Sequence, residues 1–307
     1  MTRLLILARR FGPYRAFADM LSTHPRLRYA LVAVVPLLWI VVADIAPLVR
    51  MVLISFYERF PLPPGETPSF TLAQYQAFVD RPLYLSAFVR TFVFGGLATL
   101  LTLVVIFPIA YYISKVVPRD KRLRLLLLAI APFWISEVIR SFAWILMLAN
   151  KGAINSFLIW TGLIGRPIEL LYNNISLTIG VLYLTSLYML LPLYAALEKI
   201  DDRLIEAASD LGASRFAILR RIIMPLSREG IITGCVLVFL LVTGLYALPQ
   251  LLGGPSNTLF ASIIGQVFSR AGDSWPLGSA FSVILIGTSL VIVAIFMALF
   301  QSRRSRA

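Results

Sequence analysis

The stretch EAASDLGASRFAILRRIIMPL, residues 206–226, is a charged, helix-forming segment between two long apolar runs. Gly212 can end a first short helix in the left-handed conformation, because glycine adopts positive φ without steric cost. Ser214 is suited to cap the N-terminus of a second helix, and Pro225 is expected to end it. The loop around this stretch, residues 198–229, is therefore predicted to contain two short helices at an angle, which we call the elbow.

Apolar and acidic residues of the elbow recur at helical spacing. The apolar positions are Leu204, Ile205, Ala208 and Leu211 on the first helix, and Phe216, Leu219 and Ile223 on the second. An opposite polar stripe is formed by Asp202, Glu206 and Asp210. Two amphipathic helices that project from a membrane would fit a groove in a cytoplasmic partner.

The chain as a whole has the composition of a polytopic membrane protein. Of its 307 residues, 59% are hydrophobic and 14% are charged, and the mean hydropathy is +0.85. Six apolar runs reach the length of about 20 helical residues that a hydrocarbon core requires; they cover residues 29–56, 86–114, 123–149, 175–197, 231–252 and 279–300. Because open sheets cannot satisfy their backbone in lipid, we predict an all-α domain of six transmembrane helices over residues 29–302.

The basic residues fall in alternate segments between these runs. They concentrate in residues 1–28, 115–124, 198–229 and 303–307. Cytoplasmic loops carry an excess of Lys and Arg, so both termini and the elbow are predicted to be cytoplasmic. The net charge of +13 then indicates membrane topology rather than nucleic-acid binding.

The basic segment of residues 1–28 does not resemble a cleavable signal, since Pro13 and Pro25 interrupt it and no separate apolar core is present. We expect the first membrane helix to act as the insertion signal. Two alternatives are open for the segment itself: an amphipathic helix along the inner leaflet, or a disordered basic tail.

The sequence offers no set of residues for catalysis in the membrane. The single His is His24 in the basic tail, and the single Cys is Cys235 in the fifth apolar run. Neither an H-E-x-x-H zinc motif nor a G-x-x-x-x-G-K-[ST] phosphate loop occurs. We therefore expect no catalytic residue, metal or cofactor in this chain, which leaves a transporter, a channel or a scaffold.

The elbow resembles the signature loop of the permease subunits of bacterial ABC importers of the type I kind. That signature reads E-A-A-x-x-x-G and closes on an I-x-x-P-like ending, which Glu206-Ala207-Ala208, Gly212 and Ile222-Ile223-Met224-Pro225 match here. The resemblance implies that the elbow binds a partner ATPase. The residues that it assigns to this contact are Glu206, Ala207, Ala208, Gly212, Ser214, Arg215, Phe216 and Pro225.

A closer resemblance, over residues 86–300, is to the subfamily that includes the spermidine/putrescine permeases. The segments that carry it are PFW at 132–134 with Arg140 and Trp144, LPLYAALEK at 191–199, LLGGP at 251–255, Gln266 with Phe268, and WPLGSA at 275–280. One segment departs from the pattern: relatives often carry acidic residues near the end of the fifth helix, where this chain reads GLYALPQ at 244–250. This departure weakens the transfer of a polycationic substrate.

The resemblance also implies an assembly. Such importers pair two permease subunits with two cytoplasmic ATPases, which bind ATP and Mg²⁺, and with a periplasmic solute-binding protein. Closure of the ATPases would then drive rigid-body alternating access of the membrane helices. A single domain without an internal repeat implies that a second, related permease chain supplies the symmetry partner in the bacterial inner membrane.

Ionisable residues within the apolar runs are candidates for a translocation path, because such a group at the bilayer centre costs at least about 2.5–3.5 kcal/mol unless it is paired or hydrated. Glu137 and Arg140 lie on one helical face in the third run, and this spacing allows either a structural ion pair or two path-lining groups. The residues expected along the path are Trp134, Glu137, Arg140, Trp144, Asp44 and Tyr246.

The function that these features favour is the permease subunit of an ATP-driven importer for a small, polar, amine-bearing solute, such as a polyamine or an amino-acid-like or opine-like compound. The alternative is a self-contained secondary transporter or channel for a small solute. Such a carrier has no need of an elbow that binds an ATPase.

Overall fold

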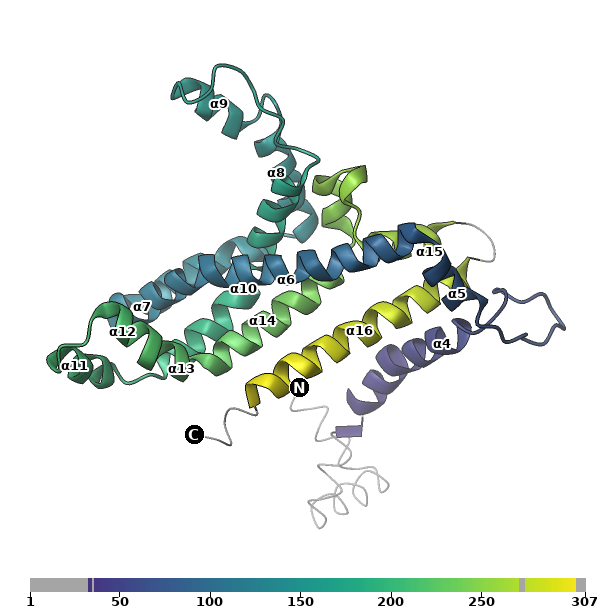
Figure 1. Cartoon of the computed structure of the whole chain (residues 1–307), viewed down its shortest axis with the longest axis horizontal. Coiled ribbons are helices and arrows are strands. Elements are labelled where there is room, and N and C mark those ends of the chain that lie inside the picture. Colours follow the sequence, from purple (N-terminus) through teal and green to yellow (C-terminus); the bar gives the residue numbers. More distant parts are fainter. Residues whose placement is uncertain (1–32, 35, 271–273, 302–307) are drawn as a thin grey trace, which may run out of the picture.

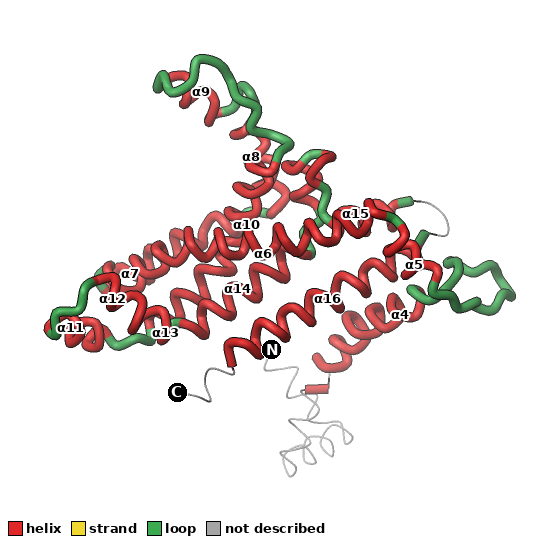
Figure 2. The backbone as a smooth tube through the Cα atoms, viewed as in Figure 1, coloured by secondary structure: helices red, strands yellow, loops and turns green. Residues whose placement is uncertain are grey.

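The computed structural model describes residues 33–34, 36–270 and 274–301, and this part of the chain is almost entirely helical (Figure 2). Within it, Tyr57 and Phe70 form an isolated antiparallel bridge. The predicted tails, residues 1–28 and 303–307, lie outside the described residues.

Five helices of the described part are long and apolar enough to cross a membrane, and a sixth span results if two helices that meet at a 69° bend are taken together. The helices of the first, second, fourth, fifth and sixth predicted runs are α4 (Ala46–Ile54), which follows the π-helical turn η1 (Ile40–Ile45), α6 (Pro82–Tyr111), α10 (Asn174–Glu198), α14 (Arg228–Thr243) and α16 (Trp275–Gln301). The predicted all-α membrane fold is confirmed.

The third predicted run, residues 123–149, is not one helix. It is divided into α7 (Arg119–Ile130), the 3₁₀ turn η3 (Ala131–Trp134) and α8 (Glu137–Leu148), with extended backbone at Ile135 and Ser136. Pro132 has no amide hydrogen to donate to the preceding turn, so the helical ladder is interrupted there. α8 and the following α9 (Ala153–Trp160) project from the side of the bundle (Figure 1).

The helix in the fifth predicted run, residues 231–252, ends before the apolar run does. α14 stops at Thr243, and a separate π-helical turn, η5 (Pro249–Gly253), follows after a short connection. Gly244 lies at the C-cap, and Pro249 begins the next turn, so the local sequence favours this division.

The core of the molecule lies where α6, α10 and α14 pack against one another (Figure 1). Small residues allow α10 and α14 to approach closely. A Cβ atom at Gly230 would lie 2.5 Å from the Cβ of Ala196, and one at Gly234 would lie 2.6 Å from the Sδ of Met189. Because a Cβ at Gly230 would also lie 2.5 Å from the backbone carbonyl of Pro192, substitution there would separate the two helices, whereas at Gly234 the Met189 side chain would have to move.

A second cluster, rich in aromatic rings, lies at the end of the bundle opposite the elbow (Figure 1). It joins α6 and α16 to two shorter helices, α5 (Ala73–Asp80) and α15 (Phe260–Ser269). Its rings belong to Phe78, Tyr84, Phe88, Phe260 and Phe281, whose neighbouring centroids are 4.7–6.0 Å apart. Edge-to-face contacts of this kind hold α15 against the long helices.

The elbow lies at the other end of the bundle, beside the start of α7 (Figure 1). It consists of α11 (Asp202–Asp210), α12 (Arg215–Ile218), the π-helical turn η4 (Leu219–Ile223) and α13 (Met224–Leu226). The prediction of two short helical units separated by a turn at Gly212 is thus confirmed.

Candidate functional site

The turn of the elbow has the geometry that its sequence predicts. Gly212 has a φ of +79°, and the amide of Ala213 donates to the carbonyl of Ala208 at 3.0 Å. The Oγ of Ser214 accepts from the amide of Ala217 at 3.3 Å and so caps α12. Nothing lies within 4 Å of the place where a Cβ of residue 212 would be, so the backbone conformation, and not crowding, requires glycine there.

Two large apolar side chains of the elbow face outward. Leu211 is 88% exposed and Phe216 is 69% exposed, although both were predicted to lie on the apolar faces of the two amphipathic helices. The residues that pack against the core instead are Ile205, Ala208, Ala213 and Leu219. Glu206, Ala207 and Arg215 are exposed beside them. We call Leu211 and Phe216 the apolar tip; exposed apolar residues rimmed by charges are typical of a protein-binding surface.

The second helical unit ends at Leu226, one residue after Pro225. Pro225 lies in α13, which directly continues the π-helical turn η4. The chain bends by 69° at Ser227, between α13 and α14. Ser227 is fully buried, and its Oγ donates to the carbonyl of Ile223 at 2.7 Å. Back-bonding of this kind competes with the helical ladder and often bends a helix.

An ion cluster that was not predicted from the sequence holds the start of α11. The Nζ of Lys115 donates to Oδ1 of Asp202 at 2.7 Å, and Oδ2 lies 3.4 Å from Arg119 and 3.9 Å from Arg122. The side chain of Lys115 is 3% exposed and also donates to the carbonyl of Ile200. The hydrogen bond from Lys115 holds the pKa of Asp202 below its ordinary value. We call these four side chains the Asp202 cluster.

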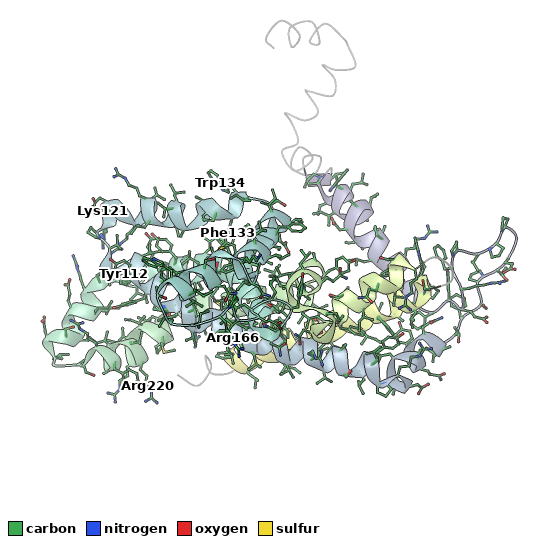
Figure 3. All side chains as sticks on the ribbon, turned by 90° about the horizontal axis from the view of Figure 1, so that it is seen from above. Tyr112, Lys121, Phe133, Trp134, Arg166 and Arg220 are labelled. Carbon is green, nitrogen blue, oxygen red and sulfur yellow. The ribbon has the colours of Figure 1, made fainter. Side chains whose placement is uncertain are left out.

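The break between α7 and α8 carries several residues predicted to line a translocation path. Trp134 is 83% exposed and points away from the bundle, whereas the neighbouring Phe133 points toward it (Figure 3). Glu137 is exposed in the first turn of α8. Trp134 and Glu137 therefore lie on surfaces that other molecules can reach.

Arg140 is embedded among aromatic rings. Its guanidinium carbon lies 4.8 Å from the centre of the Phe133 ring and 5.8 Å from that of Tyr183 on α10. Trp144 meets the same Tyr183 ring edge-on, at 5.6 Å. Within the described residues no ion pair joins Arg140 to Glu137, and the buried Nε and Nη1 of Arg140 have no hydrogen-bond partner. The sequence left two alternatives for Glu137 and Arg140, a structural ion pair or two path-lining groups. The ion pair is not formed.

The other two predicted path residues lie elsewhere. Tyr246 packs across α15: a Cβ at Gly265 would lie 2.0 Å from its ring, and Ser262 donates to its carbonyl at 3.1 Å. Asp44 is exposed on η1 in the first span, and no ion pair of the described residues includes it. The structure thus brings together Arg140 and Trp144, through Tyr183, and leaves Asp44 and Tyr246 apart from them.

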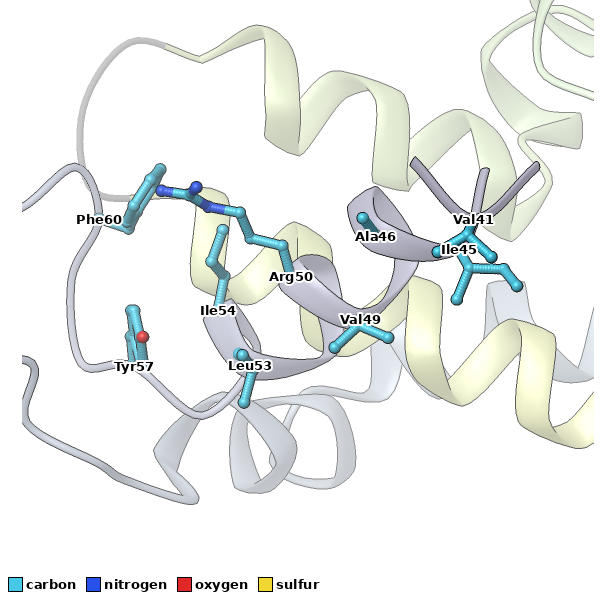
Figure 4. Close-up of a pocket in the computed structure, with 9 residues that line it drawn as sticks. All are labelled: Val41, Ile45, Ala46, Val49, Arg50, Leu53, Ile54, Tyr57 and Phe60. Atoms are coloured by element: carbon cyan, nitrogen blue, oxygen red, sulfur yellow. The ribbon is translucent and has the colours of Figure 1, made fainter. Parts of the chain in front are cut away.

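A groove with a volume of about 570 Å³ runs along α4 and holds a further cation of the first span. The side chain of Arg50 extends through it toward the ring of Phe60, with Tyr57 nearby (Figure 4). Its remaining lining is aliphatic, so Arg50 is the charged group of an otherwise apolar groove.

Comparison with known proteins identifies the family. Residues 121–306 match the family described as the binding-protein-dependent transport system inner membrane component. The chain belongs to this family. It is therefore a membrane permease subunit of an importer, and the alternative of a self-contained carrier is excluded.

Two relatives extend the similarity over most of the chain. The spermidine/putrescine transport system permease protein PotB of Escherichia coli (strain K12) is 39% identical over 237 residues, which are 77% of this chain and 83% of the relative. PotB of Haemophilus influenzae is 36% identical, over 84% of this chain and 88% of the relative. The predicted resemblance to this subfamily is confirmed.

A solved structure shares the fold at low sequence identity. It is the bacterial alginate ABC transporter in complex with an alginate-pentasaccharide-bound periplasmic protein, a chain of which is 18% identical. The TM-score is 0.71, over 91% of this chain and 94% of the other.

In the described part of the present chain, no group of three or more His, Cys, Asp and Glu side chains could hold a metal ion.

Proposed function

We propose that this permease subunit imports a small, polar, amine-bearing solute of the polyamine type, with the energy of ATP that a partner subunit hydrolyses. The observation that carries the proposal is the elbow, whose apolar tip and Glu206 are exposed at one end of the bundle. The solute class is supported by the two relatives, which are named for spermidine and putrescine.

The partners follow from this proposal. Two copies of a cytoplasmic ATPase, which bind ATP and Mg²⁺, would each receive an elbow through the apolar tip. A second, related permease would supply the other elbow, and a periplasmic binding protein would deliver the solute. Residues 29–302 would form the domain of the inner membrane, and the basic segments 1–28 and 303–307 would lie in the cytoplasm.

The translocation path in this proposal runs past the α7–α8 break. Glu137 would accept the ammonium group of the solute, since its carboxylate is exposed and has no ion pair to Arg140. Trp134 would offer a neighbouring aromatic face to the same cation. Arg140 and Trp144 would fix the position of the break through Tyr183.

The elbow is tested by Gly212→Trp. Position 212 has a positive φ, so the substitution distorts the turn, and the new side chain lies beside the apolar tip. We expect the ATPase to be lost from the purified complex and uptake to fall to background. Gly162→Trp is the matched control, because Gly162 has a φ of +73° and open space but lies after α9. ATPase binding and uptake at wild-type levels in Gly212→Trp would contradict the proposal.

A further inference from the structure

The elbow is directly connected along the chain to only two helices of the bundle. Residues 199–201 connect it directly to α10, and the bend at Ser227 connects it to α14. α6, which forms most of the second span, and α7, which precedes the candidate span Glu137–Trp160, are more than 70 residues earlier in the sequence. Motion of the elbow can reach these two helices only across contacts between side chains and packed surfaces.

The Asp202 cluster is a polar contact of this kind. Lys115 lies in η2 (Tyr112–Val116), the π-helical turn that continues α6, and its ammonium group is almost fully buried. Arg122 belongs to α7, is buried, and donates from Nε to the carbonyl of Val117 at 2.9 Å. Arg122 therefore ties α7 to the end of α6, and both cations face the same carboxylate.

Because of the position of Asp202, this contact can transmit motion of α11. It is the first residue of α11, so any rotation or shift of α11 displaces its carboxylate. The buried ammonium of Lys115 has two acceptors, the carboxylate and the carbonyl of Ile200. Separating a buried charge from its partner is strongly unfavourable, so the end of α6 is expected to follow α11.

We propose that Asp202 is a positioning residue that transmits motion of the elbow to α6 through Lys115 and to α7 through Arg122. This inference rests on the proposed role of the elbow in ATPase binding. It adds that binding and transmission are separate properties. The apolar tip binds the ATPase, and Asp202 moves α6 and α7 through the two buried cations, Lys115 and Arg122.

The test uses the complete importer in vesicles, with spermidine as the transported probe. In Asp202→Asn the ATPase should stay bound and hydrolyse ATP, while spermidine taken up per ATP falls about tenfold, within the usual range of coupling between sites. Arg119→Gln is the matched control, since Arg119 contacts the same carboxylate but its side chain is 81% exposed. Its uptake per ATP should stay near the wild-type value, because exposed ion pairs contribute little.

A charge exchange separates an electrostatic link from a general loss of packing. Lys115→Glu alone places two carboxylates together and should abolish uptake. Lys115→Glu combined with Asp202→Lys restores the opposite charges of this one pair. Because Arg119 and Arg122 remain beside position 202, the double variant should recover part of the uptake and exceed both single variants. Failure of the double variant to exceed either single variant, or wild-type uptake per ATP in Asp202→Asn, would overturn the inference while leaving ATPase binding by the elbow intact.

A distance measurement tests the same inference without altering the cluster. Spin labels at Arg203 on α11 and Leu128 on α7, in a Cys235→Ala background, should keep their separation when ATP and vanadate trap the closed ATPases; both positions are exposed. Labels at Arg203 and Leu290 on α16 should change separation. Equal changes in both pairs would overturn transmission through Asp202. No change in either pair would instead contradict the proposed coupling role of the elbow.

Discussion

Arg140 shows how a charge can be held in a membrane subunit without a carboxylate partner in the described residues. The ring centres of Phe133 and Tyr183 lie 4.8 and 5.8 Å from its guanidinium carbon, which supplies cation–π attraction at a half-buried position. Its Nε and Nη1 still lack acceptors. Arg140 therefore stabilises the α7–α8 break through aromatic contacts, and Glu137 remains available for another role.

Glu137→Gln should therefore leave the importer assembled. A broken buried pair costs roughly 3–5 kcal/mol, and this cost does not apply where no pair is formed. We expect normal recovery of the complex and normal basal ATP hydrolysis, with uptake of spermidine reduced more than that of an uncharged analogue. Glu169→Gln, an exposed carboxylate in the loop after α9, is the control. Normal spermidine uptake by Glu137→Gln would exclude Glu137 from the path.

At the scale of elements, α15 depends on a contact made by a distant side chain. The Oγ1 of Thr91 on α6 accepts from the amide of Phe260, the first residue of α15, at 2.8 Å. Both residues are fully buried, so water cannot replace the acceptor. The amide of Phe260 would otherwise be unpaired at the start of α15. Thr91 on α6 thus caps α15.

Thr91→Val should loosen α15 without disturbing α6. The isosteric change leaves a buried donor unpaired, which costs about 1–3 kcal/mol and corresponds to roughly tenfold to hundredfold faster local opening. Hydrogen exchange of the amides in Phe260–Ser269 measures this opening. Thr99→Val is the control, because Thr99 is also buried on α6 but donates only within its own helix, to Gly95. Equal exchange in the two variants would contradict the capping role.

The sequence predicts the elements of this protein better than their contacts. Hydropathy identifies five of the six runs as helices, and the signature residues place the turn at Gly212 and the cap at Ser214. It does not reveal the break before α8, since Pro132 alone does not determine whether a helix kinks or stops. The Asp202 cluster and the Arg140 site are not predictable either, because Asp202 meets Lys115 across 87 residues and Tyr183 belongs to a different span.

At the scale of the whole molecule, the elbow and the aromatic cluster lie at opposite ends of the bundle (Figure 1). The loop of residues 55–72 lies with the aromatic cluster, and Lys121 and Arg220 lie at the elbow end (Figure 3). Large apolar side chains are exposed along the long helices between these ends, as expected where lipid or another subunit covers them. The arrangement is compatible with a cytoplasmic elbow.

Single cysteines in a Cys235→Ala background test this orientation. An impermeant thiol reagent applied from the periplasm should label Pro64→Cys and Gly165→Cys and should not label Ser214→Cys. The three positions are exposed loop or cap residues, so access to the reagent depends on the side of the membrane. Position 272 belongs to the same predicted periplasmic set but lies outside the described residues. Labelling of Ser214→Cys in sealed cells would contradict the predicted orientation and place the elbow in the periplasm.

The Asp202 cluster has three cations and one carboxylate, and its tolerance of change is therefore unequal. Loss of Arg119 leaves two cations in place, whereas loss of the carboxylate leaves three like charges beside one another. In a library that varies every position, substitutions at 119 should survive selection for growth on the imported solute. Position 202 should accept little besides Glu. Inherited variation at this corner of the protein will accordingly accumulate at the exposed Arg119 and spare the single acid, Asp202.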